Sequence, residues 1–93
     1  SEMCIRDRLL TDLKVVFDGH DHKPTHDILR ALYAIEESPW SELRGKPLSP
    51  RKLANLLRPY NVKPKDVRMG PKTLKGYYAE DLWDGWERYV PTP

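Results

Sequence analysis

The segment LSPRKLANLLRPYNVKPKDVRMGPKTLKGYY, residues 48–78, indicates the fold more directly than any other part of the chain. Its first part predicts a helix beginning at Ser49 and Pro50, because serine is a favoured N-cap and proline is tolerated at the first helical position. Pro59 is expected to end this helix. Three leucines recur at the spacing of one helical face: Leu53, Leu56 and Leu57.

The second part of this segment, residues 60–78, predicts a β-hairpin. Val62, Val67 and Met69 alternate with polar residues, as in a half-buried strand. Residues 70–73 carry the glycine and proline of a turn, and residues 74–77 return as a second strand. Basic residues stand in both strands and at the tip of the hairpin.

Three further helices are expected around this segment. Apolar spacing predicts the first over residues 9–17 and the second from Thr25, as N-cap, to the residues before Pro39. A loop at residues 20–24 would separate these two helices. The last helix is expected over residues 79–89, with five side chains facing the core: Leu82, Trp83, Trp86, Tyr89 and Val90.

The order helix, helix, helix, hairpin, helix predicts a mainly α fold of the α+β class. It is the order of a winged helix-turn-helix, with three helices, a β-hairpin wing and a C-terminal helix. The connection over residues 38–48 is longer than the short turn usual in this motif. We expect the domain to span residues 9–91, between a tail at 92–93 and a poorly structured segment at 1–8 that resembles a translated sequencing adapter.

The composition fits one small folded domain. The chain has 93 residues, of which 39% are hydrophobic and 32% charged, so disorder is not expected. A single cysteine excludes a disulfide framework within the chain. No apolar run approaches the length that spans a bilayer and no secretory signal is visible, so we expect a cytoplasmic protein without a membrane partner.

Sequence motifs of catalysis are absent. No nucleotide-binding loop, dinucleotide fingerprint or nucleophile elbow occurs, which favours a binding module over an enzyme and predicts no cofactor. His20, His22 and His26 lie near carboxylates, and the last two have a spacing compatible with zinc. Because no cysteine pair accompanies them, we interpret this stretch as a polar loop and predict no metal site.

The charged residues are strongly segregated along the chain. Residues 44–75 hold ten basic residues and one acidic residue, a net charge of +9. The remainder holds six basic and thirteen acidic residues, a net charge of −7. Such a one-sided segment is typical of a surface that meets a polyanion. The alternative is a solvated basic face balanced by acidic helices packed beside it.

Nine residues of the basic segment are predicted to contact DNA. Four lie on the outward face of the helix after Ser49, where arginine and asparagine can contact base edges: Arg51, Lys52, Asn55 and Arg58. Five lie in or beside the hairpin, where they would contact phosphates: Lys63, Lys65, Arg68, Lys72 and Lys75. We expect helix and hairpin to lie side by side, so that their cations form one surface. The alternatives are cations that are merely solvated and lysines that protect an edge strand from aggregation.

The aromatic residues are expected mainly in the core. A domain this small depends on large side chains for packing, which favours core positions for Trp40, Tyr60 and Trp86. Base stacking by Tyr77 or Tyr78, beside the hairpin, is an alternative to core packing for these two residues.

Four motifs carry a resemblance to a known family: GKPL (45–48), LRPY (57–60), KGY (75–77) and EDLWDGWERYVP (80–91). About residues 9–91 resemble a domain of unknown function that closes the C-terminus of phage, plasmid and prophage primase-helicase-type proteins. Members are typically preceded by an ATPase or primase portion, which this sequence lacks. The resemblance implies a fragment or detached tail of a larger replication protein in a bacterial, prophage-carrying or phage-infected cell, with the upstream ATPase or primase domain as a partner.

Two functions are compatible with these observations. The first is a non-catalytic DNA-binding accessory module that positions duplex or single-stranded DNA for the upstream ATPase or primase-helicase. The second is a regulatory domain that docks on that ATPase or on another replication protein, with its basic face against an acidic protein surface.

Overall fold

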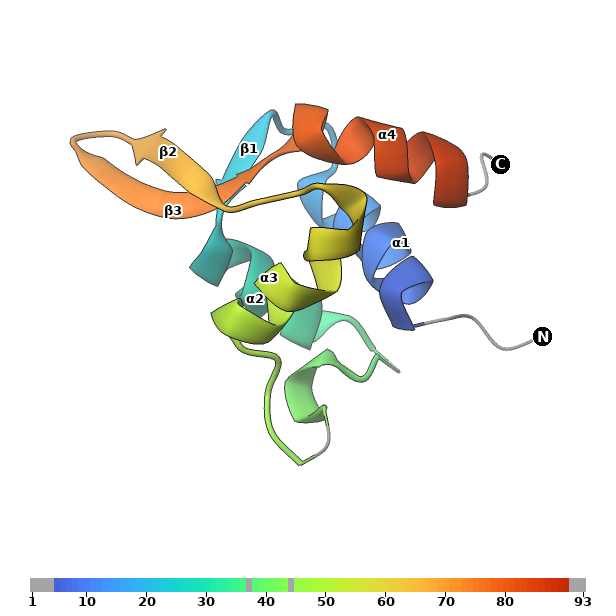
Figure 1. Ribbon diagram of the computed structural model, residues 1–93. Helices are drawn as coiled ribbons and strands as arrows, with labels where there is room; N and C mark the ends of the chain where they lie inside the picture. Colours follow the sequence, from blue (N-terminus) through green and yellow to red (C-terminus); the bar gives the residue numbers. More distant parts are fainter. Residues whose placement is uncertain (1–4, 37, 44, 91–93) are drawn as a thin grey trace.

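The computed structural model of the chain describes residues 5–36, 38–43 and 45–90. Within these residues, four α-helices, three β-strands and two short 3₁₀ helices form a mixed α+β domain (Figure 1). In chain order the elements are α1 Ile5–Phe17, β1 His22–Pro24, α2 Thr25–Ala34, η1 Trp40–Glu42, α3 Pro50–Leu57, η2 Arg58–Tyr60, β2 Lys65–Met69, β3 Lys72–Tyr78 and α4 Ala79–Tyr89.

The three strands form an antiparallel sheet in the order β1–β3–β2. β2 and β3 are joined by a tight turn in which Gly70 has a φ of +65°, a backbone conformation that glycine adopts without steric cost. The hairpin predicted within residues 60–78 is therefore confirmed, and its base continues into the core through β3.

Strand β1 lies where the sequence predicts a loop, so that prediction is wrong for residues 22–24. Only three residues pair with β3, which is too few for an alternating pattern to be visible. The pairing depends on Gly76 of β3. A Cβ atom there would lie 2.3 Å from the carbonyl oxygen of Lys23 and 2.8 Å from the Cα of Pro24. Glycine at position 76 therefore lets the two backbones approach closely.

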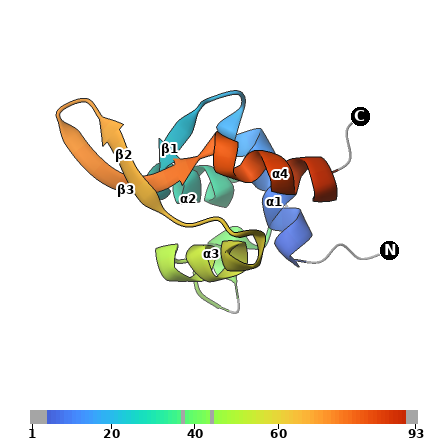
Figure 2. The same cartoon turned by 45° about the horizontal axis from the view of Figure 1, so that its top comes forward.

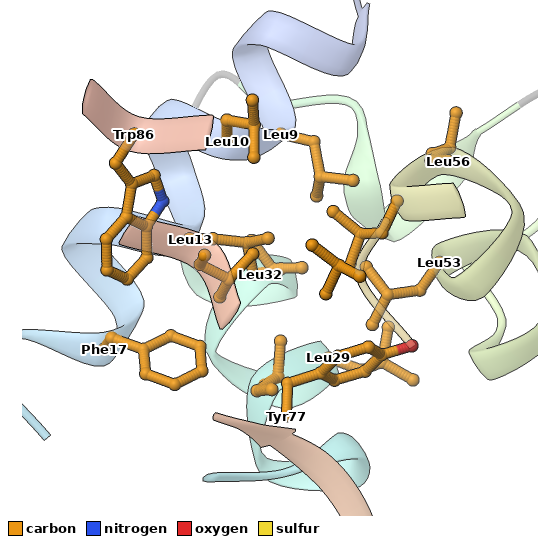
Figure 3. Close-up of a cluster of buried hydrophobic side chains, with 14 of the residues drawn as sticks. Leu9, Leu10, Leu13, Phe17, Leu29, Leu32, Leu53, Leu56, Tyr77 and Trp86 are labelled. Atoms are coloured by element: carbon orange, nitrogen blue, oxygen red, sulfur yellow. The ribbon is translucent and has the colours of Figure 1, made fainter. Parts of the chain in front are cut away.

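The core lies between the helices and the inner face of the sheet. Figure 3 shows Trp86 of α4 at one side of the buried cluster, and Leu53 and Leu56 of α3 at the other. Leu9, at the N-terminal end of α1, and Tyr77, on β3, also belong to this cluster. Each fully buried large apolar side chain contributes about 2 kcal/mol to folding, so α3 and α4 are held in place from opposite sides of one core.

Helix α1 begins four residues earlier than expected. The prediction of a poorly structured segment is wrong for residues 5–8, which form the first turn of the helix. Asp7 lies in this turn, where a carboxylate complements the helix dipole, and Thr11 Oγ1 donates to its carbonyl oxygen. Residues 1–4, residue 91 and the predicted tail at 92–93 lie outside the described residues.

The long connection between α2 and α3 is anchored by Trp40. This side chain is fully buried, and its Nε1 donates to Asp12 Oδ2 at 2.6 Å, which confirms the predicted core position. The amide of Leu48 donates to the carbonyl oxygen of Trp40, so the chain returns to the core before α3 begins.

Helix α2 itself differs from prediction, because Pro24 rather than Thr25 precedes it and no side chain caps it.

Two aromatic residues of α4 are more exposed than the sequence predicts. Trp86 is buried as expected, but Trp83 is 61% and Tyr89 49% exposed. At 3.6 residues per turn, the face that buries Leu82 and Trp86 leaves position 83 about 100° away from Leu82. Tyr60 is half-buried and packs edge-on against Tyr89, with ring centroids 5.2 Å apart.

Candidate nucleic-acid interface

Helix α3 presents an outward stripe of polar side chains. Its predicted start is confirmed, because the Ser49 side chain accepts a hydrogen bond from the Lys52 amide at 3.1 Å and Pro50 occupies the first turn. Burial of the three leucines turns the opposite face to solvent, where Arg51, Asn55 and Arg58 follow the i, i+4, i+7 spacing of one stripe. Lys52 is exposed beside this stripe.

The first turn of α3 holds two cations and no acidic residue. Each cation there is unfavourable by about 0.3–1 kcal/mol, because the N-terminus is the positive end of the helix dipole. A bound phosphate would reverse the sign of this interaction, since it is attracted by the dipole, the free backbone amides and the side chains together. Arg51 and Lys52 are thus placed where an anionic ligand stabilises the helix.

The register of the hairpin divides its cations between two faces. Side chains alternate along a strand, and Lys65 lies opposite Gly76, whereas Arg68 lies opposite Thr73. Arg68 and Lys75 therefore share the face of Tyr77, which is buried in the core and turned toward the helices. Lys65 and Lys72 belong to the other face. The expected single surface is accordingly wrong for these two lysines.

Two of the hairpin lysines form ion pairs. Lys65 Nζ lies 2.8 Å from Asp81 Oδ2 on α4, and the hydrogen bond between them raises the pKa of Lys65. Lys75 Nζ lies 2.8 Å from Asp66 Oδ1 across the strand pair. Six predicted cations have no carboxylate oxygen within 4.0 Å in the part of the chain that the structure describes: Arg51, Lys52, Arg58, Lys63, Arg68 and Lys72.

The hairpin and the start of α3 project from the same side of the molecule. In Figures 1 and 2 both lie on the left, whereas α4 and the N-terminal end of α1 lie on the right. All nine residues predicted to contact DNA are exposed. Lys63 lies in the linker between them, but the hairpin extends away from α3 in both views, so the expected side-by-side arrangement of helix and hairpin is not seen.

The tyrosines at the base of β3 are differently placed. Tyr77 is only 1% exposed, so the alternative of base stacking by this residue is wrong, and burial raises the pKa of Tyr77 to about 12. Tyr78 is half-buried, and its hydroxyl donates to the carbonyl oxygen of Asp66 at 3.0 Å. Its ring centroid lies 5.6 Å from that of His22.

The three histidines have separate partners. The Nδ1 atom of His20 lies 2.8 Å from the carbonyl oxygen of Phe17, and His26 Nε2 lies 3.1 Å from Asp27 Oδ1, while His22 packs on Tyr78. Across residues 5–36, 38–43 and 45–90, no group of three or more potential metal ligands is assembled. Over the same residues, no helix has both the length and the apolar character needed to cross a membrane.

Fold and surface together define a small α+β domain that exposes cations from one helix and one hairpin. Residues 1–89 match the family described as "Protein of unknown function (DUF3631)", and the chain belongs to this family. This confirms the expected resemblance to a domain of unknown function, and the match includes residues 1–8.

A relative from Saccharopolyspora erythraea is described as "Uncharacterized 28.9 kDa protein in xis 5'region". It is 34% identical to this chain over 88 residues, which cover 94% of the chain and 34% of the relative. The chain therefore spans about a third of the length of this relative. No solved structure matches the chain.

Proposed function

We propose that the domain is a winged helix-turn-helix that binds DNA as a non-catalytic accessory module of a larger phage or mobile-element replication protein. In this proposal α2 and α3 form the helix-turn-helix, α3 is the recognition helix, and β2 with β3 is the wing. The element order α1–β1–α2–α3–β2–β3 supports it, as does the resemblance carried by the four motifs. The greater length of the relative supports a part within a larger protein.

The observation that carries the proposal is the group of six exposed cations without a carboxylate partner among the described residues. On α3, Arg51 and Asn55 have side chains that hydrogen-bond to guanine and adenine edges in the major groove. On the wing, Arg68 faces the helix side, and Lys72, although on the opposite face, lies beside the turn at the tip, where both would contact phosphates. A surface that needed only solubility would not require cations at the positive end of a helix.

The two paired lysines have a smaller role in this proposal. A phosphate that contacts Lys65 or Lys75 must compete with Asp81 or Asp66 for the ammonium group. We therefore expect their removal to lower DNA affinity less than the removal of Arg51 or Arg68.

The proposal is tested by fluorescence anisotropy of a labelled duplex, and of the corresponding single strand, across a salt series. If four to six phosphates are contacted, log K should fall with log salt with a slope of about −4 to −5. The variant R51A/R68A/K72A should bind more weakly and lower this slope by about 3. Arg88→Ala on α4 is the matched control, because it removes a cation that pairs with Asp84 away from α3 and the wing.

A folded domain that binds neither duplex nor single strand at about 50 mM salt, where electrostatic binding is strong, would refute the proposal. Binding that R88A and the triple variant weaken equally would refute the assignment of the interface. We call the six exposed cations without a carboxylate partner the basic surface: Arg51, Lys52, Arg58, Lys63, Arg68 and Lys72. If DNA does not bind but the same triple variant loses affinity for the remainder of the larger protein, the basic surface is a protein-docking surface instead.

A further inference from the structure

A second surface lies where the end of α1 meets α4. Residues from 14–21 and 79–90 line a cavity of about 600 Å³, and an adjoining hollow of about 440 Å³ follows at the start of α4. The two hollows share Asp21, Ala79 and Trp83. Trp83, with 61% of its surface exposed, therefore stands between them. We call the two hollows together the α1–α4 groove.

The α1–α4 groove has an apolar floor and an acidic rim. Phe17, Ala79, Trp86 and Val90 are buried residues that line the larger hollow. Four exposed carboxylates line one hollow or the other, and none forms an ion pair within the described residues: Asp18, Asp21, Glu80 and Glu87. One lysine, Lys14, is among the lining residues. The rim is thus net negative around an exposed tryptophan.

The folded core does not need a tryptophan at position 83, because most of this side chain is exposed. An exposed tryptophan beside apolar hollows is typical of a protein-interaction site, because such anchors dominate interface energies. The groove also lies away from α3, since α4 and α3 pack on opposite sides of the core (Figure 3). Its carboxylates would repel a nucleic acid and attract a cationic ligand.

We propose that the α1–α4 groove binds a cationic peptide segment of another protein. An apolar or aromatic side chain of that segment fills the larger hollow, and a lysine or arginine lies over the Trp83 ring, where cation–π attraction adds to the carboxylates. Two hollows joined across one side chain fit an extended or helical segment with successive anchors better than a small molecule. This proposal does not depend on DNA binding by the opposite side.

The test uses selection from a library of displayed random 12-residue peptides against the folded domain. We expect enriched peptides to combine several lysines or arginines with at least one aromatic or long aliphatic residue. Trp83→Ala should weaken their binding by at least about tenfold, as for a hot-spot residue. The matched control is Tyr89→Ala, which removes another exposed aromatic side chain of α4 that does not line the groove.

A second pair of variants tests the rim. E87Q should weaken the selected peptides several-fold, whereas E42Q, which removes an exposed carboxylate on η1, should not. All four variants change exposed side chains, and chemical denaturation checks that each remains folded. DNA affinity of W83A should equal that of the unmodified domain, which separates this test from that of the proposed function.

Three outcomes would overturn the proposal. The first is enrichment of acidic or neutral peptides, or of none that binds at the groove. The second is equal loss of binding in W83A and Y89A. The third is concentration-dependent self-association of the unmodified domain that W83A abolishes, which would place a second copy of the chain in the groove.

Discussion

The basic surface and the α1–α4 groove differ in shape, charge and origin. The basic surface consists of side chains that protrude from α3 and the hairpin, all within residues 51–75. The groove is a hollow assembled from residues 14–22 and 78–90, which are far apart in the chain. One small core thus supports two surfaces of opposite charge: protruding cations suit a rigid polyanion, and a hollow with an acidic rim suits a flexible cationic chain.

The two surfaces are supported by the same part of the fold, which we call the frame: strands β1 and β3 and the Lys65–Asp81 ion pair. β1 follows directly from the loop that walls the groove, and it pairs with β3, which continues into the hairpin. The Lys65–Asp81 ion pair also joins the hairpin to α4. A substitution in this frame should therefore alter both surfaces, whereas a substitution on either surface should alter that surface alone.

The largest effect is expected from Gly76→Ala. The new methyl group would clash with the backbone of β1 and with Val67 Cγ2, so β1 and β3 must separate. Overpacking of this kind should lower the free energy of unfolding by about 3 kcal/mol, measured by chemical denaturation. Both DNA and peptide binding should weaken together.

Gly70→Ala is the control for this prediction. A Cβ at position 70 meets no atom within 4 Å, so only the positive φ is unfavourable, and the expected loss is about 1 kcal/mol. Equal destabilisation by the two substitutions would show that the contact between β1 and β3 does not hold the frame.

Charge reversal on the basic surface should separate the two binding activities. R51E/R68E should lower DNA affinity by about a hundredfold, because each substitution replaces attraction by repulsion at a position proposed to contact DNA. Binding of the selected cationic peptides should remain unchanged, and fluorescence anisotropy with either ligand measures both. A loss of peptide binding of similar size would mean that the two surfaces are not independent.

The free energy of unfolding should fall at alkaline pH because Tyr77 is buried. Folding raises the pKa of Tyr77 from 10.0 to about 12, so the neutral phenol is favoured in the folded state. The contribution of Tyr77 to the free energy of unfolding is fully present below pH 10. It is lost as the pH rises toward 12, by up to about 1.4 kcal/mol per pH unit. Denaturation across this range should show a smaller decline for Tyr77→Phe, and parallel declines would contradict the prediction.

The smallest effect is expected at the ion pair that joins the two surfaces. Lys65→Met and Asp81→Asn should each lower the free energy of unfolding by less than about 1 kcal/mol, because both partners are partly exposed. The double variant should be no less stable than either single variant.

Lys72→Met, on the same hairpin face without an ion pair, should lower DNA affinity more than K65M does.

Local patterns predicted the elements that carry the basic surface. The cap formed by Ser49, the leucine face of α3 and the turn of the hairpin each involve residues close in sequence, and the structure confirms them. The predicted alternation holds only for Val67, because Val62 precedes β2 and Met69 is exposed. The division of hairpin cations could also have been predicted, since Lys65 and Arg68 are three residues apart and therefore face opposite ways in a strand.

The groove could not be predicted in this way. Its walls come from segments separated by about sixty residues, and the exposure of Trp83 depends on which face of α4 packs on α1. Apolar spacing alone placed Trp83 in the core together with Trp86. Strand β1 was missed for a related reason, because its three residues are defined by their pairing with Gly76, Tyr77 and Tyr78 of β3 rather than by their own pattern.

The arrangement of charge across the core gives the domain a directional electrostatic field although its net charge is only +2. Carboxylates are carried by α4 and the end of α1, whereas cations are carried by α3, and Figure 3 shows α4 and α3 on opposite sides of the core. Near a polyanion such a dipole experiences a torque that turns α3 toward the polyanion before contact. Salt screens this torque beyond a Debye length of about 8 Å at physiological ionic strength. The domain would thus arrive pre-oriented, with Trp83 trailing and still accessible to a second partner.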